Sequence, residues 1–184
     1  MIKIQIKSIW GEVLFEYAKD NNTLKDTLEE AVKQGANLYG ANLYRANLYR
    51  ANLNGANLNR ANLDRANLDG ATNIPFIPFA CPSDGAFIGW KKVGNCLVIL
   101  EIPEDARRCS CTSQKCRCDK AKVLGITNLD TNESVSEIKN TSYSPAVTYV
   151  VGEMVYPDSF DENRWNECSH GIHFFINKQD AINY

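Results

Sequence analysis

The chain has 184 residues, a mass of 20.6 kDa and nearly balanced charge, with 20 basic and 22 acidic side chains. This length allows one or two small domains, and the charge balance argues against a protein that binds nucleic acid through general positive charge. Because no apolar run approaches about 18 residues and the start of the chain alternates polar and apolar residues, we expect no membrane segment, no signal peptide and a cytoplasmic location.

The first 35 residues carry the pattern of a hairpin followed by a helix. Apolar residues alternate with polar ones in residues 2–6 and 13–17, on either side of Trp10-Gly11-Glu12, which predicts two paired strands. Thr23 with Asp26 three residues later indicates a helix start, and the apolar spacing continues to about residue 34, where Gly35 ends it. We interpret residues 1–35 as an N-terminal cap.

Seven uninterrupted copies of Ala-Asn-Leu-x-x fill residues 36–70. This period of five fits neither a helix nor a strand, and it resembles the pentapeptide-repeat family. The resemblance implies a short right-handed quadrilateral β-solenoid over residues 36–74, with four repeats in each coil, Leu in the interior and Ala at the corners. Burial of such a narrow apolar column requires coils that stack at about the strand spacing of 4.8 Å. Leu53, in the central repeat, is expected to be fully buried.

After the repeats, residues 74–79 form an apolar connector with two prolines, which favour an extended chain. Residues 75–184 then alternate strand-like runs with turn signals, and the last seven residues have a helical pattern. The strand-like runs are Ala86–Trp90, Cys96–Ile102, Ala121–Ile126, Thr148–Val155 and Ile172–Ile176. We therefore predict a mainly β protein with a C-terminal β-rich α+β domain over residues 75–184.

This C-terminal half also resembles a domain of unknown activity that accompanies pentapeptide repeats in bacteriophage proteins. The residues that carry the resemblance are Phe87–Lys91, Ile102–Arg108, Pro157–Cys168 and Gly171–Phe175. The resemblance implies a phage-encoded protein acting in the host cytoplasm, but it brings no known chemistry.

Four of the seven cysteines form two Cys-x-Cys pairs: Cys109, Cys111, Cys116 and Cys118. If the four residues between the pairs form a hairpin turn, residue 109 pairs with 118 and residue 111 with 116, which places all four thiols on one face. Four thiolates on one face would suit a structural Zn²⁺. The alternative is a set of reduced thiols on a mobile basic loop, because a chain without an export signal keeps its thiols reduced.

The C-terminal segment from Gly171 is similar to the strand-and-helix pattern of ADP-ribosyltransferases, with matches at Gly171, Ile172, Phe174, Ala181 and Tyr184. His173 stands where that family usually has Tyr, and the family's upstream His and later Glu have no counterpart. This favours a relative of the fold without the reaction. Cys168, His170 and His173 are close in sequence and form a weaker metal candidate, for which a structural role of the histidines is the alternative.

The outward positions of the repeats carry Tyr39, Tyr44 and Tyr49 together with arginines that include Arg45 and Arg65. Exposed Tyr and Arg are enriched in protein interfaces, so these five residues form a candidate interface. The alternative is a solvated surface that keeps the solenoid soluble. Gyrase inhibition by DNA mimicry is excluded, because residues 36–70 have four Arg and two Asp and span only roughly 10 Å.

We predict a non-enzymatic binding protein. Its solenoid serves as scaffold or homo-oligomerisation element, and its C-terminal domain binds a host protein or a small, nucleotide-like ligand, as in an anti-defence factor. The predicted pocket residues are Trp90, Lys91, Arg164 and His173, the aromatic, cationic and titratable residues that strand patterning explains least. No sequence-specific nucleic acid and no membrane is expected as partner, and the alternative is an ADP-ribosyltransferase-like nucleotide-binding or enzymatic domain.

Overall fold

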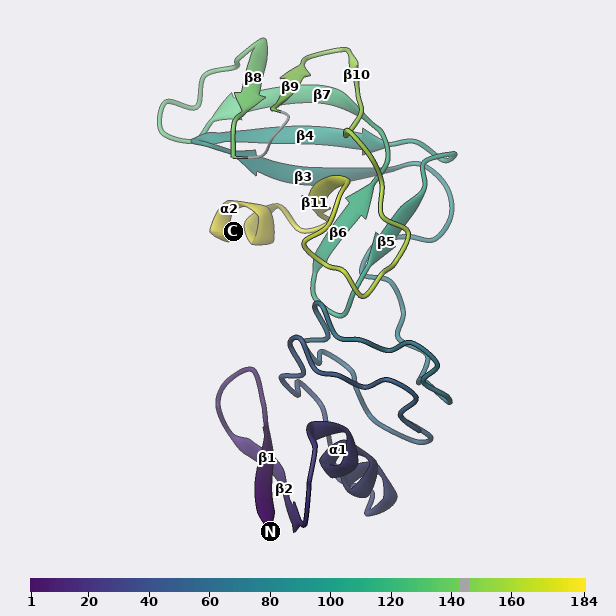
Figure 1. The fold of residues 1–184 in the computed structure, drawn as a ribbon. Coiled ribbons are helices and arrows are strands. Elements are labelled where there is room, and N and C mark those ends of the chain that lie inside the picture. Colours follow the sequence, from purple (N-terminus) through teal and green to yellow (C-terminus); the bar gives the residue numbers. More distant parts are fainter. Residues whose placement is uncertain (143–145) are drawn as a thin grey trace. The chain divides into compact units, whose positions relative to one another are not determined.

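The computed structural model describes residues 1–142 and 146–184 and divides the chain into two units, both drawn in Figure 1. The N-terminal unit comprises Met1–Pro78 with Cys111–Ser113, and the C-terminal unit comprises Phe79–Ser110 with Gln114–Tyr184. The division after Pro78 lies within the connector that the two prolines predicted.

The N-terminal unit begins with the hairpin and helix that the sequence pattern indicates. Strand β1 (Ile2–Lys7) pairs antiparallel with β2 (Val13–Lys19), and α1 follows as Leu24–Lys33. Thr23 caps this helix: its side chain accepts from the Asp26 N–H, and the Asp26 carboxylate accepts from the Thr23 N–H. The helix therefore starts where the capping box predicted.

The repeats form coils in which each residue lies beside the residue twenty positions later. Parallel bridges join Asn42 to Asn62 and Asn47 to Asn67. The leucine that follows each bridged Asn donates its backbone N–H to the bridge partner, from Leu43 to Asn62 O at 2.8 Å, from Leu48 to Asn67 O at 2.8 Å, and from Leu53 to Thr72 O at 3.0 Å. Four pentapeptides therefore complete one coil, and the pairing continues to Thr72, beyond the last exact repeat.

A tight turn at every corner explains the period of five. The Ala46 N–H donates to Leu43 O at 3.0 Å, and Arg45, between them, has a positive φ of 55°. The same position of the preceding repeat holds Gly40, with a φ of 67°, where glycine is favoured for its backbone freedom. Each repeat's Asn supports the turn, as when Asn42 Oδ1 accepts from the Tyr44 N–H. The Asn of each repeat therefore has a structural role in the turn, separate from any effect on solubility.

The interior of the coils is a column of leucines. All seven repeat leucines are buried, and Leu53 is fully buried as predicted. Every inward position is apolar, so this column has no side chain that could pair with a charge.

The C-terminal unit is built on a seven-stranded antiparallel sheet in the order β10-β7-β4-β3-β11-β6-β5 (Figure 1). A separate two-stranded ribbon pairs β8 with β9, and a short helix, α2, ends the chain. The bounds are β3 Phe87–Val93, β4 Cys96–Ile102, β5 Arg108–Ser110, β6 Lys115–Cys118, β7 Ala121–Asn128, β8 Glu137–Asn140, β9 Val147–Val150, β10 Met154–Val155, β11 Ile172–Phe175 and α2 Lys178–Asn183. Four of the five predicted strand-like runs correspond to β3, β4, β7 and β11, and the C-terminal helix is present. The predicted run Thr148–Val155 is instead broken by a turn into β9 and β10, which belong to different sheets.

The two faces of this sheet pack differently. The main core covers one face and includes Val98, Leu100 and Phe174, while α2 packs through Ala181 against Phe175 on the other. Gly89 on β3 lets the Phe174 ring approach, because a Cβ at this position would lie 2.7 Å from a ring carbon. This contact fixes the last strand, β11, against β3 in the middle of the sheet.

Leu53→Asp tests the coil assignment. An unpaired carboxylate in the leucine column should destabilise the N-terminal unit by about 4 kcal/mol or more and prevent its folding. The control is Asn54→Asp, which places the same charge on the adjacent exposed position. Thermal unfolding measured by circular dichroism should show loss of folded protein for Leu53→Asp alone; a folded Leu53→Asp variant with an unchanged melting temperature contradicts the assignment.

Candidate functional site

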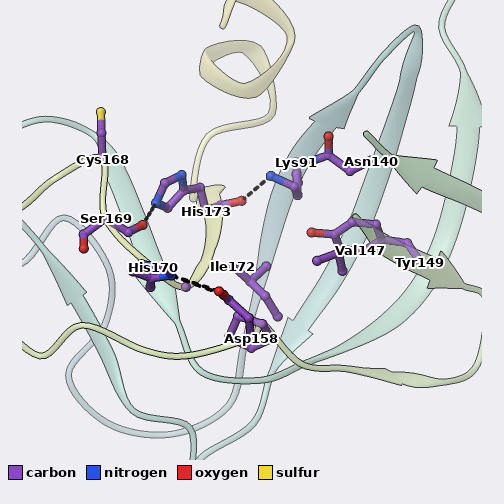
Figure 2. Close-up of a pocket in the computed structure, with 12 residues that line it drawn as sticks. Lys91, Asn140, Val147, Tyr149, Asp158, Cys168, Ser169, His170, Ile172 and His173 are labelled. Atoms are coloured by element: carbon purple, nitrogen blue, oxygen red, sulfur yellow. Dashed lines mark hydrogen bonds and ion pairs between the residues drawn. The ribbon is translucent and has the colours of Figure 1, made fainter. Parts of the chain in front are cut away.

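The C-terminal unit contains a cavity of about 270 Å³ that strands from separate parts of the chain enclose. Figure 2 shows Asn140, Val147 and Tyr149 from β8 and β9 on one side, with the segment before β11 facing them. The cavity is lined by Lys91, Asn140, Val147, Tyr149, Pro157, Asp158, Cys168, Ser169, His170, Gly171, Ile172 and His173. A smaller cavity of about 120 Å³ shares Lys91, Asn140 and His173 with it.

The cavity lies where the central sheet separates. Strands β3 and β11 pair at one residue pair, Trp90 with Phe175. Beyond that pair the next link is made by a side chain, because Lys91 Nζ donates to the His173 carbonyl oxygen at 3.2 Å. Figure 2 shows the Lys91 nitrogen directed at the main-chain oxygen of His173, while the His173 ring points toward Ser169. Beyond the single β3–β11 residue pair, the hydrogen bond between the two strands is therefore made by the Lys91 side chain rather than by a backbone N–H.

Lys91 is a buried cation, with 8% of its surface exposed. Burial lowers its pKa to about 8, because the ammonium loses hydration, and the positive charge of Lys115 acts in the same direction. At pH 7 the protonated form still dominates by about ten to one. In the described part of the chain no ion pair involves Lys91.

His173, whose carbonyl oxygen accepts from Lys91, has an uncharged side chain. Burial and the charges of Lys115 and Lys91 lower the pKa of His173 to about 3. Its Nε2 lies 2.8 Å from Ser169 O, and because a carbonyl oxygen only accepts, Nε2 carries the proton. His173 therefore stays uncharged at neutral pH and fixes the segment that precedes β11.

Arg117 on β6 also binds the segment that precedes β11. Its guanidinium is almost fully buried and donates to three backbone carbonyls, those of Asp161, Asn163 and His170, each at 2.9 Å. Gly171 allows the close approach: its φ is 138°, and a Cβ there would lie 3.3 Å from Arg117 Cβ. Arg117 and Gly171 therefore fix this wall of the cavity, although neither residue belongs to a recognisable sequence motif.

At the rim, the Asp158 carboxylate and the His170 ring are hydrogen-bonded, with 3.1 Å between Oδ2 and Nδ1. This hydrogen bond lowers the pKa of Asp158. Asp158 is the one acidic residue among the described residues that line the cavity, and it already has this histidine as a partner.

Cys168 lines the cavity and is the one exposed cysteine of the seven. The Lys115 ammonium lies 3.0 Å from its Sγ and 3.1 Å from the Tyr184 hydroxyl. Burial lowers the pKa of Lys115, but the contacts with Cys168 and Tyr184 outweigh that effect and raise it overall. Lys115 therefore stays charged beside the thiol.

Of the four predicted pocket residues, the structure brings Lys91 and His173 together. Trp90 lies on the opposite face of β3, where it packs with Leu97 and Phe175. Arg164 lies elsewhere: its Nε donates to Ser110 O, and its guanidinium is 4.6 Å from the centre of the Phe79 ring. These two residues therefore do not belong to the site.

Sequence reasoning missed Asn140, Tyr149 and Ser169, which line the cavity. None of them stands in a motif, and strand alternation alone does not distinguish a cavity from a core. His170 was considered as a metal ligand, whereas the structure pairs it with Asp158. In residues 1–142 and 146–184 no group of three or more His, Cys, Asp or Glu side chains is arranged to hold a metal.

The predicted pairing of the Cys-x-Cys segments is wrong by one residue. Strands β5 and β6 pair Cys109 with Arg117, Ser110 with Cys116, and Arg108 with Cys118. Because paired residues share a face and neighbours alternate, Cys109 lies opposite to Cys116 and Cys118. Cys109, Cys111, Cys116 and Cys118 are all buried, and Cys109 does not share a face with Cys116 and Cys118 as the predicted pairing required. The structural zinc remains a prediction.

The tyrosines predicted as an interface are exposed on the repeats, from 36% for Tyr39 to 45% for Tyr49. Each arginine beside them covers a ring within the same coil surface: the Arg45 guanidinium lies 5.0 Å from the centre of the Tyr44 ring. Arg65 occupies the same turn position as Arg45, with a φ of 58°. The interface remains a prediction.

Two family profiles match the chain. That of DUF5758, a family of unknown function, matches residues 77–181, and that of the pentapeptide repeats matches residues 34–72 with eight copies. The eighth copy agrees with the pairing that continues to Thr72. No curated protein and no solved structure matches the chain. No helix in the described part of the chain is long and apolar enough to cross a membrane.

The burial of the cysteines predicts how they react. In the native, reduced protein a thiol reagent such as Ellman's reagent should label Cys168 quickly, whereas all seven thiols should react after denaturation. Cys168→Ser should remove the fast phase, and Cys96→Ser, at a buried position, should leave it in place. Rapid labelling of several thiols in the native protein contradicts the structure, and elemental analysis of the same sample tests the zinc hypothesis, which predicts about one Zn²⁺ per chain.

Proposed function

The chain belongs to the DUF5758 family, whose function is unknown, and we propose that its C-terminal unit binds a small molecule in the cavity between β3, β9 and β11. The observation that carries the proposal is the cavity of about 270 Å³ into which the buried Lys91 is placed. A concave site that combines apolar side chains with a few convergent polar groups is typical of small-molecule binding, and the walls here contain both.

The composition of the walls supports binding of an organic molecule. Val147, Tyr149 and Ile172 offer apolar surface, and Asn140 offers an amide that donates and accepts. The main-chain segment opposite is fixed by Arg117, so the cavity is pre-formed rather than created by the ligand. Pre-formed sites lose less ordering entropy on binding.

We propose binding rather than catalysis because the two histidines and the carboxylate of the cavity are already engaged. His173 is neutral and donates from Nε2, and His170 is paired with Asp158. An ADP-ribosyltransferase-like reaction stays the alternative, and it is favoured by the arrangement of β11 followed by α2, the strand and helix in which the resemblance lies.

For the N-terminal unit we propose a right-handed quadrilateral solenoid that serves as a scaffold or oligomerisation element. The hairpin and helix are proposed as its cap: the Ile9 N–H donates to Gly40 O at 2.8 Å, and Glu29 accepts from the Asn52 N–H at 2.8 Å. Capping of an exposed end is what short repeat arrays require. A role against host defences, in host cytoplasm, follows only from the phage resemblance and is proposed on that ground.

The binding proposal is tested by filling the cavity. Native mass spectrometry of protein purified from its host should show a retained small molecule, and Val147→Phe, which adds a ring to the cavity wall, should remove it. Val151→Phe is the matched control, because Val151 is exposed just beyond the same strand. Both variants should keep the melting temperature within a few degrees.

Two results would contradict the proposal. If the Val147→Phe variant retains the ligand to the same extent as the Val151→Phe control, the ligand binds outside this cavity. Turnover of NAD⁺ by the unmodified protein, lost in Val147→Phe, would replace binding with the transferase reaction.

A further inference from the structure

We propose that the ligand of the cavity is a small organic anion whose acid group binds the Lys91 ammonium. This inference rests on the proposed function and names the class of its ligand. Its basis is a buried cation for which the described residues supply no ion-pair partner, and it stands on contacts and burial in the C-terminal unit alone.

The hydrogen bonding of Lys91 is incomplete. An ammonium has three N–H donors, and within residues 1–142 and 146–184 Lys91 Nζ has one acceptor, the His173 carbonyl at 3.2 Å. Buried charges in proteins are usually paired, because a cation removed from water without a partner is costly. An acid group in the cavity would supply both the missing acceptors and the missing negative charge.

The surrounding charges favour an anion as well. Lys115 is close enough to lower the pKa of Lys91, and Lys92 lines the smaller cavity beside it. Asp158 is the acidic residue among the described residues that line the larger cavity, and its carboxylate is hydrogen-bonded to His170. Lysines therefore outnumber acidic residues around the two cavities, and the carboxylate is engaged by His170 rather than by Lys91.

The size and the walls limit the rest of the ligand. A cavity of about 270 Å³ accommodates a single ring system with short substituents. The apolar surface of Val147, Ile172 and Tyr149 suits the ring, while Asn140 lies on both cavities and can bond to a polar substituent. We infer a compact aromatic or heterocyclic acid, either a carboxylate or a phosphate monoester.

Binding of such an acid depends on pH in a defined direction. The free Lys91 has a pKa of about 8, and the anion stabilises its charged form, so affinity should be constant below pH 7 and decrease as pH rises above about 8. A bound anion raises the pKa of Lys91 by the same linkage.

The other groups that face Lys91 titrate outside this range or are paired. The pKa of His173 is lowered to about 3, and burial raises the pKa of Cys118. The pKa of Lys115 is raised, and that of Asp158 is lowered by its bond to His170. Cys168 and Tyr149 also line the cavity, and Cys168→Ser and Tyr149→Phe variants separate their titration from that of Lys91.

The experiment uses the full-length protein with three probes that share one ring: benzoate, phenyl phosphate and benzyl alcohol. Binding is measured by calorimetry at pH 7 and pH 9.5, and the Lys91 pKa by NMR of ¹³C-labelled lysine. The variants are Lys91→Met, which keeps the aliphatic stem, and Lys122→Met, its control on the exposed position of β7.

At least one of the two anions should bind about 10- to 100-fold more tightly than benzyl alcohol at pH 7, the range expected for a hydrogen bond to a charged group. Which anion binds distinguishes a carboxylate ligand from a phosphate ligand. The preference should disappear in Lys91→Met, persist in Lys122→Met and weaken at pH 9.5, and the bound anion should raise the Lys91 pKa.

Two results would overturn the inference. If benzyl alcohol binds as tightly as both anions and the Lys91 pKa does not change, the cavity binds small molecules but does not select anions, and the proposed function survives. If no probe binds the unmodified protein at millimolar concentration, both the anion inference and the proposed cavity fail. Folding of Lys91→Met is checked by its amide NMR spectrum, and Lys91→Gln replaces it if it does not fold.

Discussion

The buried guanidinium of Arg117 is the interaction on which the C-terminal unit depends. It binds three main-chain carbonyls of the segment between β10 and β11, and these bonds give an otherwise irregular stretch of chain a fixed path. A buried cation is expensive unless all its donors are used, and five donors in a planar group suit several carbonyls at once. Lysine at this position would leave most of those carbonyls without a partner.

Two of the buried cations of this unit, Arg117 and Lys91, are therefore used in opposite ways. Arg117 is surrounded by acceptors from the chain itself, which makes it a structural residue. Lys91 has one acceptor and lies in a cavity, which makes it a candidate for binding. The difference between them is the number of acceptors the fold supplies, and this number cannot be derived from residue type.

The N-terminal unit depends on local geometry instead. Its turns need a residue with positive φ at every fifth position, and the chain supplies either glycine or arginine there. Arginine is strained in this conformation, yet its side chain covers a neighbouring tyrosine ring, as Arg50 covers Tyr49 at 4.8 Å. The Tyr-Arg pairs can therefore be explained in part by contacts within the coil, without a partner.

The sequence by itself determined the coils, the buried leucines, the capped helix and most strands of the C-terminal unit. These features arise from contacts between residues close in the chain or from a repeated period, so the pattern contains the information. The tertiary structure alone decided the register of β5 and β6, where a shift of one residue moved Cys109 to the other face. It also decided the site: Lys91, Asn140, Tyr149 and His173 come from four strands, and Trp90, adjacent to Lys91, faces away. The physical reason is that a cavity arises where a ladder between distant strands ends, and that end is set by packing across the whole sheet rather than by any segment.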